Sequence, residues 1–254
     1  EDEAFQTRRT GTSPGRVSVL PLIATVLSDP LDLSSARTPA IRESGSPDPD
    51  AAGRIKRMSD NQHEVFETNR TFADLGLRDT LLQALDENGW THPTHIQAKL
   101  IPEMLADKDL LGQAKTGTGK TAAFALPILH HADKDAGPQA LVLAPTRELA
   151  TQIVAEINEL GKHTPIRAVS IVGGEAFDKQ LKHLKAGGHI VVGTPGRVMD
   201  LQQRGQLKFK HMRWAVLDEV DRMLDIGFRD DIRKILSRIE GEHQTVFVSA
   251  TISE

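Results

Sequence analysis

The chain contains no cysteine, which excludes disulfide frameworks and thiolate-bound metal sites and is typical of a reducing compartment. None of its 10 histidines stands in a spacing typical of metal ligands, such as HExxH. No apolar run is long enough to span a bilayer, so we expect a cytoplasmic protein without a membrane partner. The net charge is only −4, so a nucleic-acid partner has to be argued from local motifs.

Aromatic residues are almost absent from the first segment, residues 1–65, which is rich in Ser, Pro, Asp and Arg. Such a segment cannot bury enough apolar surface to offset its ordering entropy, so we predict that it is disordered. The chain begins at Glu1, and Met58 opens a stretch that reads like an ordinary protein start. Residues 1–57 are therefore either a genuine flexible extension or a non-native leader.

The second segment, residues 66–254, alternates short apolar runs with stretches of helical period. The runs suited to buried parallel strands are Asp109–Leu111, Ala140–Ala144, Ala168–Val172, Ile190–Val192, Ala215–Leu217 and Thr245–Val248. The predicted helices are Leu77–Asn88, His95–Leu105, Lys120–His131, Arg147–Gly161, Phe177–Ala186 and Arg229–Ile239. This alternation predicts an α/β fold with a doubly wound parallel sheet flanked by helices, in which functional motifs follow the strands.

A phosphate-binding loop, AKTGTGKT, follows the first predicted strand and opens a helix. It matches GxxxxGK[ST] with Ala in the first position, and its alternative interpretation is a flexible turn. The glycines let backbone N–H groups face phosphate oxygens, next to the positive end of the helix. Lys120 is predicted to bind the β- and γ-phosphates and Thr121 to bind Mg²⁺. The predicted nucleotide-binding residues of the loop are Ala114, Lys115, Thr116, Gly117, Thr118, Gly119, Lys120 and Thr121.

Two carboxylates follow a later apolar strand in the sequence VLDEVD. We predict that Asp218 holds Mg²⁺, partly through water, and that Glu219 orients and deprotonates the attacking water. Acidic residues at this place can also be simple helix N-caps, and Asp221 could be one. Together with the phosphate-binding loop, the pattern indicates a catalytic trio of Lys120, Asp218 and Glu219.

Seven short motifs together carry a resemblance to a family. In chain order they are HPTHIQ (92–97), AKTGTGKT (114–121), PTREL (145–149), GG (173–174), TPGR (194–197), DEVD (218–221) and SAT (249–251). In this order they resemble the first RecA-like domain of DEAD-box RNA helicases, which are P-loop NTPases of superfamily 2. Stretches such as TFADLGL resemble the bacterial members of that family. The resemblance covers about Thr71 to Glu254 and implies ATP and Mg²⁺ as cofactors and RNA as partner.

The resemblance implies further nucleotide contacts. Gln97 matches a glutamine whose amide pairs with the adenine edge, because an amide both donates and accepts hydrogen bonds. Phe72 lies where an aromatic ring packs against the base, although a core phenylalanine is a serious alternative. Thr94 is expected to support the phosphate loop, and Trp90 is expected to be structural.

The RNA contacts implied by the resemblance lie at loop-to-helix junctions, where N–H groups point outward. These residues are Pro145, Thr146, Arg147, Gly173, Gly174, Thr194, Pro195, Gly196 and Arg197. Such contacts read the backbone, so we expect little sequence specificity. An internal salt bridge is the alternative for Arg147, and a plain turn is the alternative for the two glycines.

Ser249 and Thr251 match the motif that links ATP hydrolysis to strand separation, through hydroxyl contacts with Asp221. Val220 replaces the family's alanine in DEAD. Because both carboxylates remain, we expect hydrolysis to survive, while the extra bulk of Val220 puts the contact between Asp221 and Ser249 in doubt.

The sequence ends just after SAT, so the family's second RecA-like domain and its arginine fingers are not in it. An arginine finger accounts for about 10³–10⁵ in rate, so we expect this chain alone to bind ATP weakly, hydrolyse it very slowly and unwind nothing. Two other functions remain open: another P-loop translocase or recombinase, and a non-catalytic RNA-binding clamp.

Overall fold

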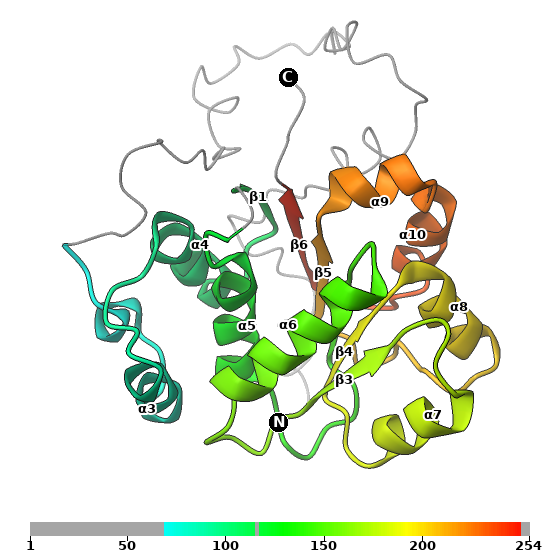
Figure 1. Cartoon of the computed structure of the whole chain (residues 1–254), viewed down its shortest axis with the longest axis horizontal. Helices are drawn as coiled ribbons and strands as arrows, with labels where there is room; N and C mark the ends of the chain where they lie inside the picture. Colours follow the sequence, from blue (N-terminus) through cyan, green and yellow to red (C-terminus); the bar gives the residue numbers. More distant parts are fainter. Residues whose placement is uncertain (1–68, 115–116, 250–254) are drawn as a thin grey trace, which may run out of the picture.

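The computed structural model describes residues 69–114 and 117–249, and Figure 1 shows the chain. The predicted disordered segment therefore lies outside the described residues, as do Lys115, Thr116 and Thr251. The helical elements are η2 (Phe72–Leu75), α3 (Asp79–Glu87), α4 (His95–Leu105), α5 (Lys120–His131), α6 (Arg147–Leu160), α7 (Phe177–Lys185), α8 (Pro195–Gln203), α9 (Val220–Ile226) and α10 (Arg229–Leu236). The strands are β1 (Leu110–Gln113), β2 (Ala140–Leu143), β3 (Ala168–Ile171), β4 (Ile190–Gly193), β5 (Trp214–Asp218) and β6 (Gln244–Ser249).

All predicted strands and helices are present, and η2, α8 and α9 were not predicted. The strands form one parallel sheet in the order β1-β6-β5-β2-β4-β3, which confirms the doubly wound α/β prediction. The central strands β2 and β5 are fully buried, whereas the edge strands β1 and β3 are partly exposed. This is why β2 and β5 read as unbroken apolar runs.

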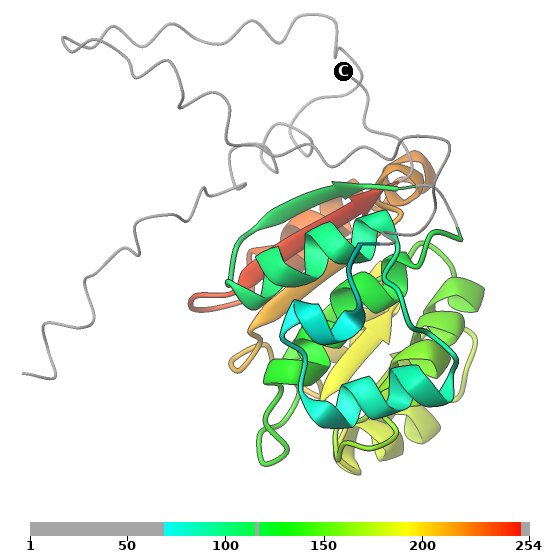
Figure 2. The same cartoon turned by 90° about the vertical axis from the view of Figure 1, so that its left-hand side faces the viewer.

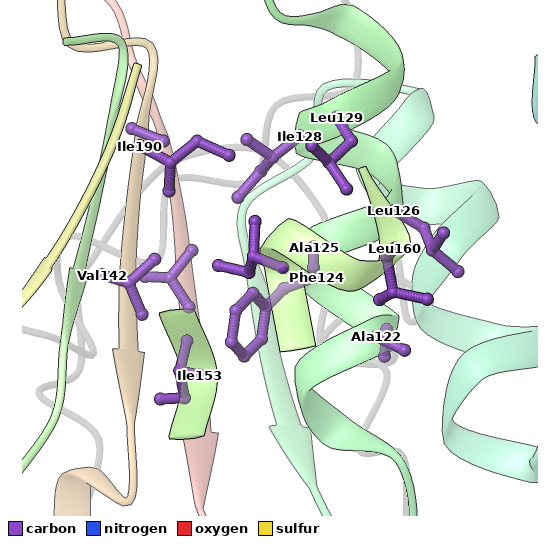
Figure 3. Close-up of a cluster of buried hydrophobic side chains, with 14 of the residues drawn as sticks. Ala122, Phe124, Ala125, Leu126, Ile128, Leu129, Val142, Ile153, Leu160 and Ile190 are labelled. Atoms are coloured by element: carbon purple, nitrogen blue, oxygen red, sulfur yellow. The ribbon is translucent and has the colours of Figure 1, made fainter. Parts of the chain in front are cut away.

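Two hydrophobic cores cover the two faces of the sheet. Along β2 the side chains alternate, so that Val142 belongs to one core while Leu141 and Leu143 belong to the other. The first core packs the sheet against α3, α4, α5 and α6, and Figure 2 shows α3 and α4 in front of the strands. In this core Phe124 of α5 lies beside Ile153 of α6, on the side of α5 that faces Val142 and Ile190 of the sheet, as Figure 3 shows. The second core packs the other face against α7, α8, α9 and α10.

The motifs that follow strands lie at the carboxyl ends of the parallel strands, and the strand order divides them into two groups. The neighbouring strands β1, β6 and β5 are followed by the phosphate-binding loop, SAT and DEVD, which we call the nucleotide half. The neighbouring strands β2, β4 and β3 are followed by PTREL, TPGR and GG, which we call the RNA half. The sequence predicted that each motif after HPTHIQ follows a strand. The order of the strands in the sheet shows in addition which of these motifs are neighbours. Among the described residues, no helix is long and apolar enough to cross a membrane.

Candidate functional site

The phosphate-binding loop runs from the end of β1 into the first turn of α5. Gly117 and Gly119 have positive φ values of 80° and 81°, which L-residues with a side chain rarely adopt. The N–H of Ala114 donates to the carbonyl of Ser249 at 3.0 Å, which joins the start of the loop to the end of β6. At these described positions the backbone has the conformation that suits a phosphate cradle.

Lys120 is the first residue of α5, and its side chain turns into the protein. The residue is only 7% exposed, and its Nζ is buried without a hydrogen-bond partner among the described residues. A buried ammonium without partners is costly unless a ligand supplies an anion. This orphaned donor, at the N-terminus of a helix behind two glycines in the left-handed region, fits the phosphates of a nucleotide.

Asp218 faces the same space from the end of β5. It is 3% exposed, and its Oδ1 is buried without a hydrogen-bond partner among the described residues. Burial raises the pKa of Asp218 to about 6, although the charge of Lys120 lowers it. The negative charge of Glu219 adds to the upward change in this pKa. The carboxylate is thus held in an unfavourable environment that a cation would relieve.

Residues 94 and 97 fasten the start of α4 to the phosphate-binding loop. The Thr94 hydroxyl donates to the carbonyl of Thr118 at 2.8 Å, and Gln97 Nε2 donates to the carbonyl of Gly119 at 3.1 Å. Gln97 Oε1 accepts from the N–H of Thr94 at 2.9 Å, which closes the capping box of α4. A Cβ on Gly119 would overlap the Gln97 amide. These bonds join α4 to the loop, while the role of Thr94 at the nucleotide site and the pairing of Gln97 with adenine stay predictions.

Two aromatic residues upstream of the loop lie in or against the first core. Phe72 is 3% exposed and packs with core residues of η2, α3 and α4, so its ring is covered in this conformation. Stacking of Phe72 on adenine stays a prediction. Trp90 packs against the same core, in agreement with its expected structural role.

Glu219 has an unusual backbone. Its φ of 53° and ψ of 51° lie in the left-handed region, which costs a residue with a Cβ about 1–2 kcal/mol. The residue caps α9, and its carboxylate accepts from Arg222 Nη1 at 3.3 Å. Strain of this kind gathers at functional sites, where the surrounding structure holds a side chain in one direction. Sequence reasoning missed Arg222, although the i,i+3 spacing could have indicated the pair.

Glu156 is a third carboxylate at this site, and sequence reasoning missed it. It lies on α6, and burial raises its pKa, while hydrogen bonding from the Thr121 side chain and the Ala122 backbone lowers it. Its charge also raises the pKa of Asp218, so it lies within electrostatic reach of that residue. Only the packing of α6 on α5 brings Glu156 here, and no local pattern in the sequence indicates it.

The residues present fit a magnesium ion only together with other ligands. The described residues contain no cluster of three or more His, Cys, Asp or Glu side chains able to hold a metal by themselves. Mg²⁺ usually takes one or two protein oxygens and completes its shell with water and phosphate oxygens. The Thr121 hydroxyl and the buried carboxylate of Asp218 meet that need.

The RNA half has its own close contacts. Arg147 is exposed at the first position of α6, behind the N-cap Thr146, which accepts from the N–H of Leu149 at 3.2 Å. Gly174 has a φ of 76°, and a Cβ there would overlap the Arg147 guanidinium. Arg147 forms no ion pair with another described residue, which speaks against the internal salt bridge considered for it. PTREL and GG therefore form one surface.

The third motif of the RNA half joins the same surface. Arg197 Nη1 donates to the carbonyl of Glu175 at 3.4 Å, directly after the two glycines, and Arg197 Nε lies 4.0 Å from Asp200. Pro195 occupies the first turn of α8, a position that proline favours. Of the predicted contact residues, Pro145 and Pro195 are buried, Gly173, Thr194 and Arg197 are half-buried, and Gly174 and Gly196 are exposed.

A family model described as DEAD/DEAH box helicase matches residues 94–254. The chain belongs to this family. It is similar to the ATP-dependent RNA helicase DeaD of Escherichia coli K12, with 48% identity over 191 residues, covering 74% of this chain and 30% of the relative. It is also similar to the DEAD-box ATP-dependent RNA helicase CshA of Geobacillus kaustophilus, with 46% identity over 185 residues, covering 72% of this chain and 40% of the relative.

A solved structure supports the same assignment. The crystal structure of a DEAD box protein from the hyperthermophile Methanococcus jannaschii matches with a TM-score of 0.70 and 41% identity, over 72% of this chain and 50% of that one. This DEAD/DEAH box helicase domain thus spans half or less of the length of these relatives.

Within this helicase domain, the residues expected to couple hydrolysis to strand separation are placed only in part. Ser249 ends β6 between β1 and β5, is 1% exposed and pairs with Gln113. Asp221 lies in the first turn of α9, and Val220, which is 7% exposed, packs in the second core. Thr251 lies outside the described residues, so the coupling role of Asp221, Ser249 and Thr251 stays a prediction.

Proposed function

We propose that this domain binds ATP with Mg²⁺ on its nucleotide half and the RNA backbone on its RNA half. Closing against a second RecA-like domain, it hydrolyses ATP and drives local separation of RNA duplexes. The buried Lys120 Nζ, which has no partner among the described residues and faces the charge of Asp218, carries this proposal. Both relatives are named ATP-dependent RNA helicases, which supports the proposal.

In this mechanism Lys120 donates to the β- and γ-phosphates, which are the anionic partner that its buried ammonium does not have among the described residues. Thr121 and Asp218 would hold Mg²⁺, which would neutralise charge that develops on the phosphates. Glu219 orients the attacking water and accepts its proton, a role for which its fixed backbone is suited. Arg222 donates to that carboxylate at 3.3 Å.

On the RNA half, Arg147 and Arg197 bind phosphates, while the two glycines allow the RNA backbone to approach. These groups do not read base edges, so binding depends little on sequence. The second domain supplies arginine fingers and the other part of the RNA site. A cytoplasmic location fits the lack of cysteine and stays a prediction.

A different P-loop translocase is the main rival, and nucleotide selectivity separates the two. We expect the chain to bind a fluorescent ATP analogue in the presence of Mg²⁺. It should bind the GTP analogue at least about tenfold more weakly, because guanine cannot form the hydrogen bonds proposed between the adenine edge and Gln97. Lys120→Ala should abolish measurable binding, whereas the exposed Lys208→Ala should not change it. Equal affinity for both analogues, or unchanged binding by Lys120→Ala, would refute the proposal.

The catalytic assignment is tested with this domain joined to a second RecA-like domain, as the proposal requires. Glu219→Gln should lower RNA-stimulated hydrolysis by about 10²-fold or more, as expected for loss of a general base, with ATP affinity kept. Unchanged turnover would mean that Glu219 is not catalytic and would favour the RNA-binding clamp.

A further inference from the structure

The open edge of the sheet carries a cleft that the helicase motifs do not use. The cleft measures about 400 Å³ and is lined by residues of α6, of β3 and of α7. Its lining includes Val154 of α6, Ser170 of β3 and Arg167, which directly precedes β3. From α7 it includes Lys179 and His183. We call it the β3-edge cleft.

The wall formed by α7 is basic. Lys179 and His183 are exposed, lie one turn apart, about 6 Å along the helix axis, and form no ion pair with a described residue. Helix stability does not explain Lys179, because a cation in the first turn of a helix opposes the macrodipole. Glu175 is the acidic residue in the lining, so positive groups predominate, although the whole chain has a net charge of −4.

The floor of the cleft offers hydrogen-bond donors. The Ser170 Oγ is buried and has no partner among the described residues. On this edge, the N–H and the carbonyl of Ala168 bond to the side chain of Asn158 at 2.9 and 3.0 Å. Because alternate residues of a strand direct their backbone groups to the same edge, the N–H of Ser170 points into the cleft. Cations and donors together form an environment for phosphate oxygens.

An added peptide strand fits the cleft less well. Such a strand needs a row of open backbone groups on the edge. The Asn158 carboxamide already occupies Ala168, and Gln180 Nε2 donates to the carbonyl of Val172 at 2.7 Å. These two side chains limit the open backbone groups of this edge to a short stretch around Ser170, which is too short for strand addition.

The cleft continues from the RNA half. The strand β3 leads into Gly173 and Gly174, and Glu175, which lines the cleft, accepts from Arg197 through its carbonyl. We propose that the β3-edge cleft binds phosphates of an RNA strand that extends beyond the RNA half, with Lys179 and His183 as contacts. This inference rests on the proposed function, and it gives the domain a longer RNA footprint than its motifs imply.

The test compares two labelled RNAs of about 6 and about 16 nucleotides by fluorescence anisotropy at low salt. The wild-type chain should bind the longer RNA more tightly. Lys179→Glu should weaken binding of the longer RNA about three- to tenfold and flatten its salt dependence by about 0.7 per lost phosphate contact. Binding of the shorter RNA should not change. Lys208→Glu, at an exposed lysine in the loop before β5, makes the same change of charge and should have no effect on either RNA.

Other outcomes overturn the inference in distinct ways. Equal loss for both RNAs would mean that Lys179 acts through the RNA half, and no loss for either would mean that the cleft does not bind RNA. If Lys179→Glu instead abolishes binding of labelled polyglutamate and leaves both RNAs unaffected, the cleft serves an acidic protein. Arg147→Ala tests the proposed function separately, because it should weaken binding of both RNAs. Unchanged binding of both by Arg147→Ala would refute the proposal that the RNA half binds RNA.

Discussion

Asp218→Asn should make the ligand-free chain more stable, and more so as the pH rises. The buried carboxyl has a pKa of about 6 in the folded chain against an ordinary value of 3.8, a difference that corresponds to about 3 kcal/mol. Between these values the folded state holds the proton and the unfolded state has released it. The free energy of unfolding of the wild type therefore falls as the pH rises from about 4 to 6, and it stays lower above pH 6.

The variant lacks this titration. Its free energy of unfolding should exceed that of the wild type by up to about 3 kcal/mol at pH 8 and by about half of that at pH 5. At pH 8 the gain corresponds to about 6–12 °C in Tm for a domain of this size. Urea unfolding without Mg²⁺ or nucleotide, followed by the fluorescence of Trp90 and Trp214, measures the free energy of unfolding at pH 5 and at pH 8.

Taking the difference between variant and wild type at each pH cancels the titration of groups that do not interact with Asp218. Asp225→Asn is the matched control, since it removes an exposed carboxylate from the same region, and it should leave stability almost unchanged. A difference between Asp218→Asn and wild type that is the same at pH 5 and pH 8 would refute the reasoning. A variant that is less stable than the wild type at pH 8 would do the same.

Two further substitutions test the two halves of the site. Gly174→Ala combines a φ of 76° with an overlap on Arg147, so we expect a loss of about 1–2 kcal/mol in stability and about tenfold in affinity for a short RNA, measured by urea unfolding and anisotropy. Unchanged RNA affinity would show that GG is a plain turn. Gln97→Ala removes the donor to the Gly119 carbonyl, so we expect about tenfold weaker binding of a fluorescent ATP analogue, and an affinity equal to wild type would contradict this.

The periodicity of the sequence predicted the sheet and most of its helices, because long apolar faces decide those elements. It did not predict α9, which has seven residues and buries only Val220 and Met223. It did not predict α8 either, although Pro195 at the first turn is a start signal. The strand order is also absent from local patterns, since it depends on which distant strands pair.

The site shows the same limit. Lys120, Asp218 and Glu219 could be predicted because each follows a strand in a recognisable motif. Glu156 could not, because it reaches Thr121 only through the packing of α6 on α5. Phe72 illustrates a different limit, since a buried aromatic and a base-stacking aromatic look the same in a sequence.

The left-handed backbone of Glu219 has a consequence for laboratory evolution. Glycine, and to a lesser extent asparagine, adopts this conformation at little cost, so replacing Glu219 would release about 1–2 kcal/mol. A screen that rewards only heat resistance would therefore accumulate Glu219→Gly and Glu219→Asn. The selected variants would be more heat-resistant, but they would lack the Glu219 carboxylate, the group proposed to activate water.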